Sequence, residues 1–539
     1  MTENNSANLM ANPHADKIPW ALIVVIIIGT FMAVLNGSIV NVALPKIMAL
    51  FNTTADGIQW VLTAYAMALG CIMPISGYLA DRFGYKRIYF SALALFTLGS
   101  AFCGLAWNVN SLIAARIIQA IGGGIMQPLG MAYAMRVVPR HRMGVVMGVW
   151  GIAAMAAPAI GPTLGGYLVE YVNWRLIFYI NVPVGIFNLW LATVLLKETP
   201  LIKGKHFDLW GVISATIGLF CLLLAISQGN KQGWGTPYIV SLFSVAFIAL
   251  GFFVYNELVQ PEPLLELRLF KNYLFTISTF VGIALNVGMF GAMFLLPLLL
   301  QSVLGQTAMK TGLILLPSAL ATALMMPIGG RIYDKYGGRV IVPVGLAIVT
   351  ITSYNMCTFN DLTPWSVMIF WLVLRGVGMG ISMMTVTTMG MITIPLHLVS
   401  RASALRNVIL QVAASLGIAM FTLVMQNRQV FHYANLINIA NLSASDGLSL
   451  QAALRQIAIT QGWDSTMTSV YVASAIAKRA ATLSSIQAIS DCFLIASAMC
   501  LVAVILSLFL RNPQLDSLEK HPEPEVKITA LSEAALDEA

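Results

Sequence analysis

A short stretch between two long apolar runs carries the charged residues best suited to chemistry. Its charged and glycine positions are Gly77, Asp81, Arg82, Gly84, Lys86 and Arg87. A carboxylate flanked by cations can pair across an interface or bind a helix N-terminus, and glycines allow two backbones to approach closely. The chemistry indicated is ion pairing that forms and breaks between helices. The alternative is a plain basic loop that only sets the orientation of the helices.

This stretch has a second, looser copy at Gly330–Arg339. Gly77, Asp81, Arg82, Gly84 and Lys86 match Gly330, Asp334, Lys335, Gly337 and Arg339, and every pair is 253 positions apart. Five matched positions in the same loop of two hydrophobic blocks indicate an internal repeat. We therefore predict two membrane halves joined head to tail, the build of a secondary transporter.

The elements that must position these loops are membrane helices. Of the 539 residues, 58% are hydrophobic and 10% are charged, which excludes a water-soluble globule. Apolar runs of about twenty residues have the length that a helix needs to cross a bilayer. We predict an all-α integral membrane protein with fourteen spans, at residues 20–44, 58–80, 88–107, 111–135, 143–168, 176–196, 209–228, 237–257, 273–300, 312–333, 340–359, 365–390, 402–426 and 486–510.

The distribution of Lys and Arg predicts the orientation of the spans. The loops on one side hold sixteen of these residues, whereas the short loops on the other side hold only Lys46, Arg175, Lys231 and Lys310. By the positive-inside rule, both termini and both charged stretches are cytoplasmic. The net charge of +8 therefore reflects topology, and we expect no binding to nucleic acid.

The repeat also predicts the domains. The charged stretch follows span 2 and its copy follows span 10, so spans 1–6 (residues 20–197) and spans 9–14 (residues 272–510) are the homologous halves. Spans 7–8 (residues 208–257) are an inserted pair. Arg116 and Arg375, 259 positions apart and each followed by a glycine cluster, support this pairing.

Three further segments lie outside the spans. Residues 1–19 are predicted to be an N-terminal cytoplasmic tail, and residues 511–539 an acidic, disordered cytoplasmic tail. Residues 428–485 are predicted to form an external loop with two amphipathic helical stretches, near Leu448–Gln461 and Met467–Leu483.

The motifs of several enzyme classes are missing from the sequence. There is no G-x-x-x-x-G-K-[ST] loop for ATP, no H-E-x-x-H, and no histidine within a predicted span. The six cysteines fall in apolar runs, so no disulfide framework or zinc site is readable. We expect neither an enzyme nor a metal protein. A receptor or subunit that recruits a partner through the external loop is an alternative that is compatible with transport.

Several further motifs are shared with a known family. They are Gln59-Trp60-Val61, Arg116-Ile-Ile-Gln119, Gly161-Pro162-x-x-Gly165-Gly166 and Trp174-Arg175…Phe178-x-Ile180-Asn181-x-Pro183-x-Gly185. With these motifs, residues 20–510 resemble the major facilitator superfamily. Within it they are similar to the fourteen-span drug:proton antiporters of the EmrB/QacA type, and the long loop before span 14 is closer to EmrB.

The resemblance implies a major facilitator fold and a secondary active exporter of lipophilic drugs or toxic compounds, cationic ones included. Such an exporter works by proton antiport and alternating access in the bacterial cytoplasmic (inner) membrane. It uses a proton gradient and no cofactor. The partners implied are a small-molecule substrate, the lipid bilayer and a membrane-fusion or adaptor protein docked on the external loop. Export of an endogenous metabolite, amino acid or lipid is the alternative, because the walls of a substrate cavity look like any membrane core.

One position departs from the family pattern. The first span of the family commonly carries an Asp implicated in proton coupling, and this sequence has Asn36 there. An amide takes up no proton at physiological pH. The remaining carboxylate inside a span is Asp491, a candidate proton carrier whose alternative is a favourable position near a helix N-terminus.

Two arginines within spans are further candidates for coupling or substrate binding. Arg116 and Arg375 are costly inside a membrane unless they are paired or face water. A structural bond from Arg116 to Gln119, Asn36 or a backbone carbonyl is the alternative.

Spans 5 and 9 complete the candidate set. Pro158, Gly161, Pro162, Gly165 and Gly166 are predicted to break the hydrogen-bond ladder of span 5 and to form a kinked gate, or else only a packing face. In span 9, the candidates are Asn286, Met289 and Phe290, because Met and aromatic side chains on one face suit an adaptable cavity. A lipid-facing or packed stripe is the alternative there.

Overall fold

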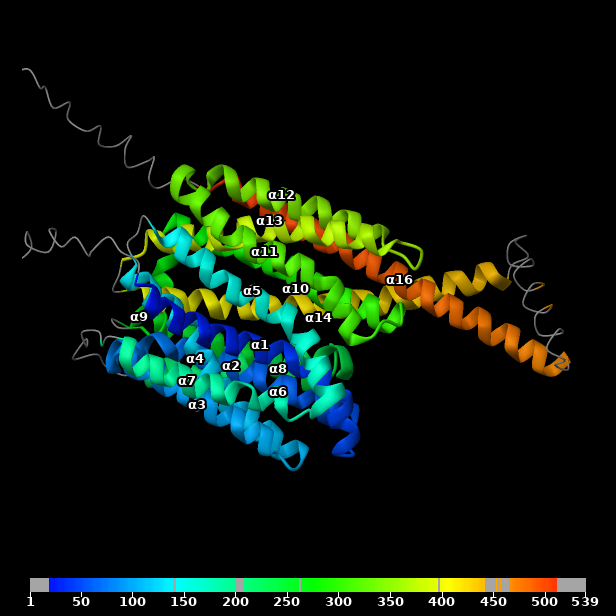
Figure 1. Ribbon diagram of the computed structural model, residues 1–539, viewed down its shortest axis with the longest axis horizontal. Helices are drawn as coiled ribbons and strands as arrows, with labels where there is room; N and C mark the ends of the chain where they lie inside the picture. Colours follow the sequence, from blue (N-terminus) through cyan, green and yellow to red (C-terminus); the bar gives the residue numbers. More distant parts are fainter. Residues whose placement is uncertain are drawn as a thin grey trace, which may run out of the picture.

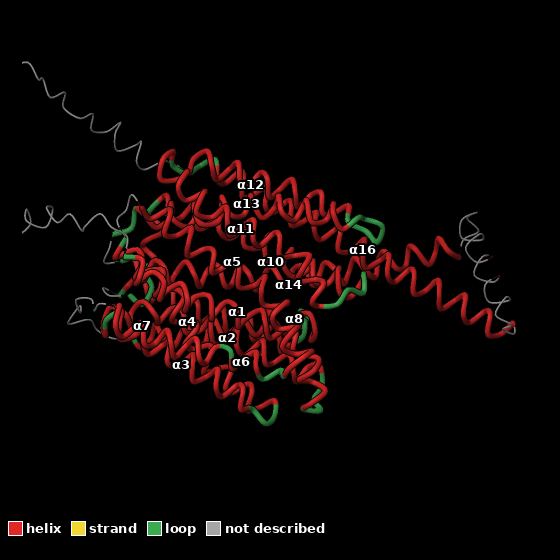
Figure 2. Tube along the Cα trace, viewed as in Figure 1, coloured by secondary structure: helices red, strands yellow, loops and turns green. Residues whose placement is uncertain are grey.

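The computed structural model describes residues 19–138, 142–196, 198, 208–260, 263–395, 398–441, 452, 456 and 465–510. In this part of the chain, helices are joined by short loops and there is no strand (Figure 2). Apart from Pro19, the predicted N-terminal tail lies outside the described residues, and so does the predicted tail 511–539.

The first group of helices corresponds to predicted spans 1–6. Its members are α1 (Trp20–Leu50), α2 (Ala55–Phe83), α3 (Tyr85–Leu105), α4 (Val109–Val137), α5 (Met143–Tyr167), α6 (Leu176–Tyr179) and α7 (Asn181–Leu195). Capping residues fix where helices begin: the Thr54 side chain accepts a hydrogen bond from the Gly57 N–H, and Asn108 and Ser111 form a capping box. These helices pack mainly on one another, which makes them one half of the molecule.

The predicted inserted pair corresponds to α8 (Leu209–Gln232) and α9 (Pro237–Val259). Asp208 caps the start of α8, and Pro237 occupies the first position of α9, where a proline ring is tolerated. The two helices pack on each other, and α8 also contacts α2 and α14. Large apolar side chains of α9 such as Phe247 and Ile248 are exposed, as expected of a helix that faces lipid.

The second group corresponds to predicted spans 9–14. Its members are α10 (Tyr273–Pro297), α11 (Ala308–Tyr336), α12 (Gly338–Asn355), α13 (Trp365–Ile392), α14 (Val399–Asn441) and α16 (Ser465–Ser507). Short π or 3-10 turns lie at Leu168–Val172, Leu267–Lys271, Leu298–Val303 and Met356–Thr358. Figure 1 shows α11, α12 and α13 on one side of the molecule and α3 and α7 on the other.

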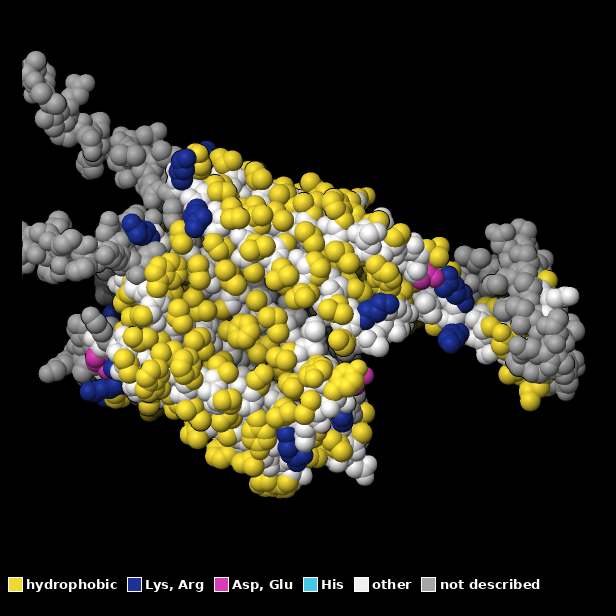
Figure 3. Space-filling view, in the orientation of Figure 1, with side chains coloured by type: hydrophobic (Ala, Val, Ile, Leu, Met, Phe, Trp, Pro, Cys, Tyr) yellow, Lys and Arg dark blue, Asp and Glu magenta, His cyan; other side chains and the backbone are white. Residues whose placement is uncertain are grey.

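Among the described residues, twelve helices are long and apolar enough to cross a membrane, and α5 and α10 run between them. Hydrophobic side chains cover the middle of the molecule, whereas Lys and Arg lie near its two ends (Figure 3). The prediction of an all-α integral membrane protein is therefore confirmed. We name the two ends cytoplasmic and external by the predicted orientation.

The region predicted as an external loop differs from the prediction. Residues 428–441 continue α14, and residues 465–485 are the first half of α16, so the two helices project together beyond the other helices (Figure 1). Neither helix contains a proline, and Gly417 is the one glycine in the two, so nothing ends them at the membrane surface. Of the predicted stretch Leu448–Gln461, all but residues 452 and 456 lie outside the described residues.

The two halves meet along a close seam between α5 and α11. A Cβ added at Gly148 would lie 2.7 Å from the backbone oxygen of Met326 and 2.7 Å from the Cα of Pro327. Near the external ends, a Cβ at Gly312 would overlap the hydroxyl of Thr163. Glycine is required at both positions because the helices touch backbone to backbone or nearly so.

We predict that Gly148→Val weakens the seam. The added side chain must push α5 and α11 apart, and overpacking of this kind costs about 1–3 kcal/mol. The thermal midpoint of the purified protein in detergent should fall, and transport should fall with it. Gly251→Val is the matched control, because a Cβ at Gly251 on α9 meets nothing within 4 Å. Equal midpoints for the two variants would contradict the prediction.

Candidate functional site

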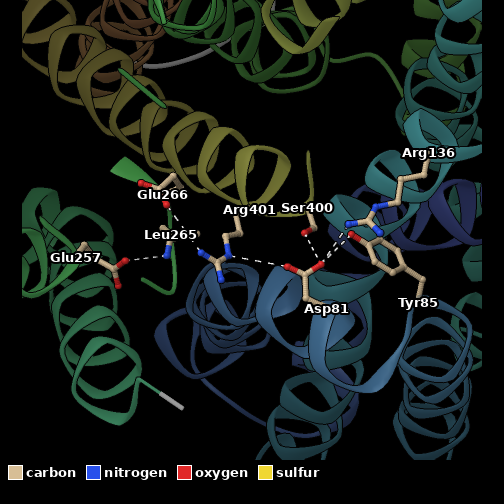
Figure 4. A network of polar contacts seen from close by, with 8 residues as sticks. All are labelled: Asp81, Tyr85, Arg136, Glu257, Leu265, Glu266, Ser400 and Arg401. Carbon is tan, nitrogen blue, oxygen red and sulfur yellow. Dashed lines mark hydrogen bonds and ion pairs between the residues drawn. The ribbon is translucent and has the colours of Figure 1, made fainter. Parts of the chain in front are cut away.

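A buried carboxylate joins the two halves at the cytoplasmic end (Figure 4). Asp81 lies in the last turn of α2, and its side chain is fully buried. Its Oδ1 accepts hydrogen bonds from Ser400 Oγ at 3.1 Å and Tyr85 OH at 3.3 Å. Arg136 Nη2 lies 3.4 Å from Oδ1, and Arg401 Nε lies 3.9 Å from Oδ2. The first half thus contributes Tyr85 and Arg136, and the second half contributes Ser400 and Arg401.

Local backbone geometry places these groups. Gly84 ends α2 with φ of 95°, a left-handed conformation that favours glycine, and α3 begins at the next residue, Tyr85. A Cβ at Gly77 would lie 3.1 Å from the carbonyl carbon and oxygen of Ser400, so the glycine lets α2 and α14 approach closely. The Arg136 guanidinium stacks over the Tyr85 ring at 4.4 Å, which holds it beside Asp81.

The network continues to the segment that follows the inserted pair. Arg401 Nη1 lies 3.9 Å from Glu266 Oε2, so one buried arginine serves carboxylates on both sides. The backbone N–H of Leu265, next to Glu266, donates to Glu257 Oε2 at 2.9 Å. Figure 4 shows this chain of contacts running from Asp81 through Arg401 and Glu266 to Glu257 on α9. We call these four residues, together with Tyr85, Arg136, Leu265 and Ser400, the cytoplasmic network.

In the described contacts, the basic residues of the charged stretch bond within the first half and to Glu198 just after it. Arg82 donates to Tyr78 OH at 2.7 Å, Lys86 donates to the Thr193 carbonyl at 2.8 Å, and Arg87 pairs with Glu198 at 3.6 Å. Gly77 and Asp81 therefore reach across the interface. Lys86 and Arg87 secure the α2–α3 turn to α7 and the segment after it, and Arg82 bonds within α2.

The copy of the stretch in the second half repeats the turn but is less completely described. Gly337 has φ of 73° and donates its N–H to the Tyr333 carbonyl, as Gly84 does to Ala80. The side chain of Asp334 lies outside the described part, and Arg339 is exposed.

A second polar cluster surrounds Arg116 within the first half. The side chain is fully buried, its Nη1 donates to Gln119 Oε1 at 2.8 Å, and its guanidinium lies 3.8 Å from the centre of the Tyr65 ring. Gln119 in turn donates to Ser100 Oγ at 2.6 Å. The predicted bond between Arg116 and Gln119 is present, and no carboxylate contacts the guanidinium within the described residues.

Asn36 lies next to this cluster. It is fully buried and close to the hydroxyl of Tyr65, yet neither its Oδ1 nor its Nδ2 has a hydrogen-bond partner among the described residues. Arg116 Nη2 is unpartnered as well. Buried polar atoms are normally satisfied, so this cluster has spare donors and an acceptor available for water or a ligand.

The second half contains two more buried arginines without carboxylate contacts in the described chain. Arg375 Nη2 donates to the Gly288 carbonyl at 3.4 Å and its Nη1 faces Met356 Sδ at 3.9 Å. Arg406 on α14 donates only to hydroxyls, Ser278 Oγ at 3.5 Å and Thr387 Oγ1 at 3.3 Å. Asn286 is buried and donates to the Gly282 carbonyl at 2.8 Å. Met289 packs beside a buried cluster, and the side chain of Phe290 lies outside the described part.

The predicted gate helix is one continuous α-helix, α5. We expected its hydrogen-bond ladder to be broken, and that expectation is wrong. Gly161 and Gly165 pack on α1: a Cβ at Gly161 would overlap Ser38, and one at Gly165 would lie 2.8 Å from Ile39. Packing against α1 on one side and α11 on the other supports the helix through this region. Gly166 is buried, and the side chains of Pro158 and Pro162 lie outside the described part.

Asp491 pairs with residues of α14, not with Arg116 or Arg375. Its Oδ2 accepts from Arg428 Nε and lies 2.8 Å from His432 Nε2. It is in the middle of α16, which begins at Ser465, so the predicted location in a first helical turn is wrong. The contacts join α14 to α16 where the two helices leave the membrane domain.

Of the eight residues of the cytoplasmic network, the sequence predicted only Asp81 as a site residue. Arg136 and Arg401 were only counted as basic loop residues, while Ser400 and Glu266 carry no motif. Contacts between residues about 320 positions apart have no local signal, although an arginine at the start of a span opposite the charged stretch is a usable hint. Within the described residues, no group of three or more His, Cys, Asp or Glu could hold a metal, and all six cysteines are free.

Comparison with known proteins places these features in context. The family model described as Major Facilitator Superfamily matches residues 26–418. The chain is 34% identical to the "Uncharacterized MFS-type transporter YhcA" of Bacillus subtilis (strain 168), over 95% of this chain and 96% of that protein. It is 32% identical to the "Multidrug resistance protein B homolog" of Mycobacterium tuberculosis (strain ATCC 25618 / H37Rv), over 77% of each chain.

Solved structures show the same fold at low identity. The human organic anion transporter MFSD10 aligns with a TM-score of 0.59 and 13% identity, over 91% of this chain and 100% of that one. The proton:xylose symporter XylE aligns with a TM-score of 0.57 and 14% identity, over 92% of this chain and 96% of that one.

We predict that Asp81→Asn strongly reduces transport and leaves the amount of protein in the membrane unchanged. The amide keeps the volume but loses the charge that holds Arg136 and Arg401, so the two halves lose their shared anion. Arg82→Gln is the control, because Arg82 is exposed and bonds only within α2 in the described contacts. Initial transport rates normalised to membrane content provide the measurement. A wild-type rate for Asp81→Asn would show that the network is not a gate.

Proposed function

We propose that this chain, which belongs to the Major Facilitator Superfamily, is a secondary active exporter of lipophilic compounds that works by alternating access and proton antiport. It is a multi-pass membrane transporter with the major facilitator fold, and it is not an enzyme. Transporters of this family need no cofactor.

The observation that carries the proposal is the cytoplasmic network around Asp81. Alternating access requires a contact between the halves that closes one end and can be broken. Two features of the network support such a role: it links α2 and α4 to α14, and its ion pairs span 3.4 to 3.9 Å. Charge-assisted hydrogen bonds are usually about 2.7–2.9 Å long, so these pairs are loose enough to be exchanged for water.

The charges inside the membrane domain bear on the substrate. Arg116, Arg375 and Arg406 are buried, and none contacts a carboxylate in the described chain. Such cations repel a cationic compound and attract an anionic one. Within lipophilic compounds, we therefore favour neutral and anionic substrates over the cationic ones that the sequence alone left open.

The names of relatives support export of drugs or toxic compounds. Besides the mycobacterial protein, the "Multidrug transporter protein MdtP" of Bacillus subtilis is 34% identical over 68% of each chain. These names describe those proteins, and a shared fold hosts many substrates. The buried charges of this chain give the narrower expectation.

We predict that a pH gradient drives export by the purified protein in liposomes. Lipophilic neutral and anionic compounds should accumulate on the acidic side, and addition of a transported compound should release protons that a pH-sensitive dye detects. The compounds to be tested are chosen first by comparing the drug susceptibility of cells with and without the protein. Liposomes with Asp81→Asn protein serve as the control for leak. Accumulation that ignores the pH gradient would rule out proton antiport, and uptake limited to cations would overturn the substrate class.

The projecting ends of α14 and α16 support a second part of the proposal, an adaptor protein on the external side. Each helix has 43 residues and is about 65 Å long, roughly twice the thickness of the hydrocarbon core. The base is held by Arg428 and His432 on Asp491, and by Arg479 on Asp361 at 2.7 Å. Beyond or beside this base, apolar side chains are exposed, among them Val430, Phe431, Met467 and Val470. Exposed apolar groups outside the membrane mark a surface for another protein.

We predict that replacing residues 436–472 with a short Gly-Ser linker leaves the membrane domain folded but prevents adaptor binding. The deletion keeps Arg428, His432, Arg479 and Asp491, so the base of the projection is retained. Thermal stability in detergent should be near that of the full chain. Crosslinking in cells should give a complex of the full chain with its adaptor, and the deletion variant should not form that complex. Unchanged crosslinks would show that no adaptor docks there.

A further inference from the structure

The cytoplasmic end of the inserted pair contains two buried carboxyl groups whose protonation the transport mechanism above does not consider. Asp208 stands just before α8, and Glu257 lies in the last turn of α9. Asp208 is 8% exposed and Glu257 is fully buried. Ionised carboxyl groups are rarely buried without partners, so each of the two must either be stabilised by neighbouring groups or carry a proton.

The two groups face each other across Gly211. A Cβ at that glycine would overlap Asp208 Oδ2 and would lie 2.9 Å from Glu257 Oε1. The two oxygens therefore flank the same point and are no more than about 5 Å apart. Two carboxylates at that separation in a buried place repel each other strongly, and such pairs retain a proton between them.

Hydrogen bonds show which of the two is satisfied as an anion. Asp208 Oδ1 accepts from the Gly211 N–H at 2.8 Å, and the Asn256 amide donates to both oxygens at 3.0 and 2.8 Å. Glu257 Oε2 accepts one bond, from the Leu265 N–H, whereas Oε1 has no partner among the described residues. Asp208 is thus held as a carboxylate, and Glu257 is held at one oxygen only.

The charged groups around Glu257 do not neutralise the negative charge that Glu257 would carry when ionised. Among the described residues, Asp208 and Glu266 are acidic, and the cation within range is Arg401, which already lies 3.9 Å from Asp81 and from Glu266. Arg268 is half-exposed and pairs with Glu266. An unpaired charge in a buried site costs several kcal/mol, and a proton on Glu257 removes that cost.

We propose that Asp208 and Glu257 form a proton-binding pair, with the proton on Glu257 Oε1 while the cytoplasmic network is intact. The proposal rests on the proposed function for its place in antiport, but not for its existence. Asp208 anchors the pair as the anion, and Gly211 leaves the space between the two groups.

The proton-binding pair is joined to the cytoplasmic network through the backbone of Leu265 and Glu266. Glu257 holds Leu265, and Glu266 next to it shares Arg401 with Asp81. When the proton leaves Glu257 Oε1 for cytoplasmic water, the new carboxylate competes with Asp81 for Arg401. Loss of the proton to the cytoplasm therefore favours opening of the cytoplasmic end.

Infrared spectroscopy of the full chain in detergent tests the pair without any transport. The wild type should show the C=O band of a protonated, buried carboxylic acid at neutral pH, and the band should disappear on alkaline titration. Glu257→Gln should lack the band, and Asp208→Asn should lose it at a lower pH because the repulsion is gone. Glu170→Gln, at an exposed carboxyl on the external side, should keep it. A wild type without the band, or a band that survives in Glu257→Gln, would overturn the proposal.

Spin labels at Phe83→Cys and Tyr336→Cys test the link to the gate, because both positions are exposed at the cytoplasmic ends of α2 and α11. Raising the pH should lengthen the distance between the labels in the wild type and not in Glu257→Gln, whose neutral amide imitates the protonated acid. If the distance lengthens equally in the wild type and in Glu257→Gln, opening of the cytoplasmic end does not depend on Glu257, which contradicts the proposal. If the band and the distances behave as expected but liposomes ignore a pH gradient, antiport fails while the proton-binding pair stands.

Discussion

The structure depends on one constraint, the burial of the Asp81 carboxylate at the junction of two halves. A buried charge is tolerated only with partners, and here these come from both sides of the interface: Arg136 and Tyr85 from one half, Ser400 and Arg401 from the other. Separating the halves removes half of the partners and requires water to replace them. The anion therefore makes closure of this end and solvation of this end mutually exclusive.

The inserted helix pair is part of this junction and not a separate addition. Arg401 lies between Asp81 and Glu266, and the backbone beside Glu266 is bound to Glu257 on α9. A substitution at the end of α9 can therefore change the junction although it is far from Asp81 in sequence. In this chain, α9 is therefore connected to Asp81 through Leu265, Glu266 and Arg401.

Much of the fold was predictable because its signals are local. The lengths of the apolar runs predicted the helices. The matched spacing of the charged stretch and its copy predicted the repeat, and the same turn geometry recurs at Gly84 and Gly337. Asp81 and Gly77 were predicted at the interface for the right physical reason. The partners were not, since Ser400, Arg401 and Glu266 meet Asp81 or each other only through tertiary packing. The continuous helices α14 and α16 were missed because an amphipathic segment indicates a helix but not whether it joins its neighbour.

The position of α8 makes the two sides of the molecule unequal. On one side, α5 and α11 meet directly at glycines, whereas on the other α8 contacts both α2 and α14, with Asn230 donating to the Ala419 carbonyl at 3.1 Å. A helix attached across one seam ties the two halves together there, whereas the α5–α11 seam is a direct contact between them. A lipophilic molecule dissolved in the bilayer accordingly meets two different walls, one bare and one covered. Any lateral opening between the halves toward the lipid would therefore be free of α8 only on the α5–α11 side.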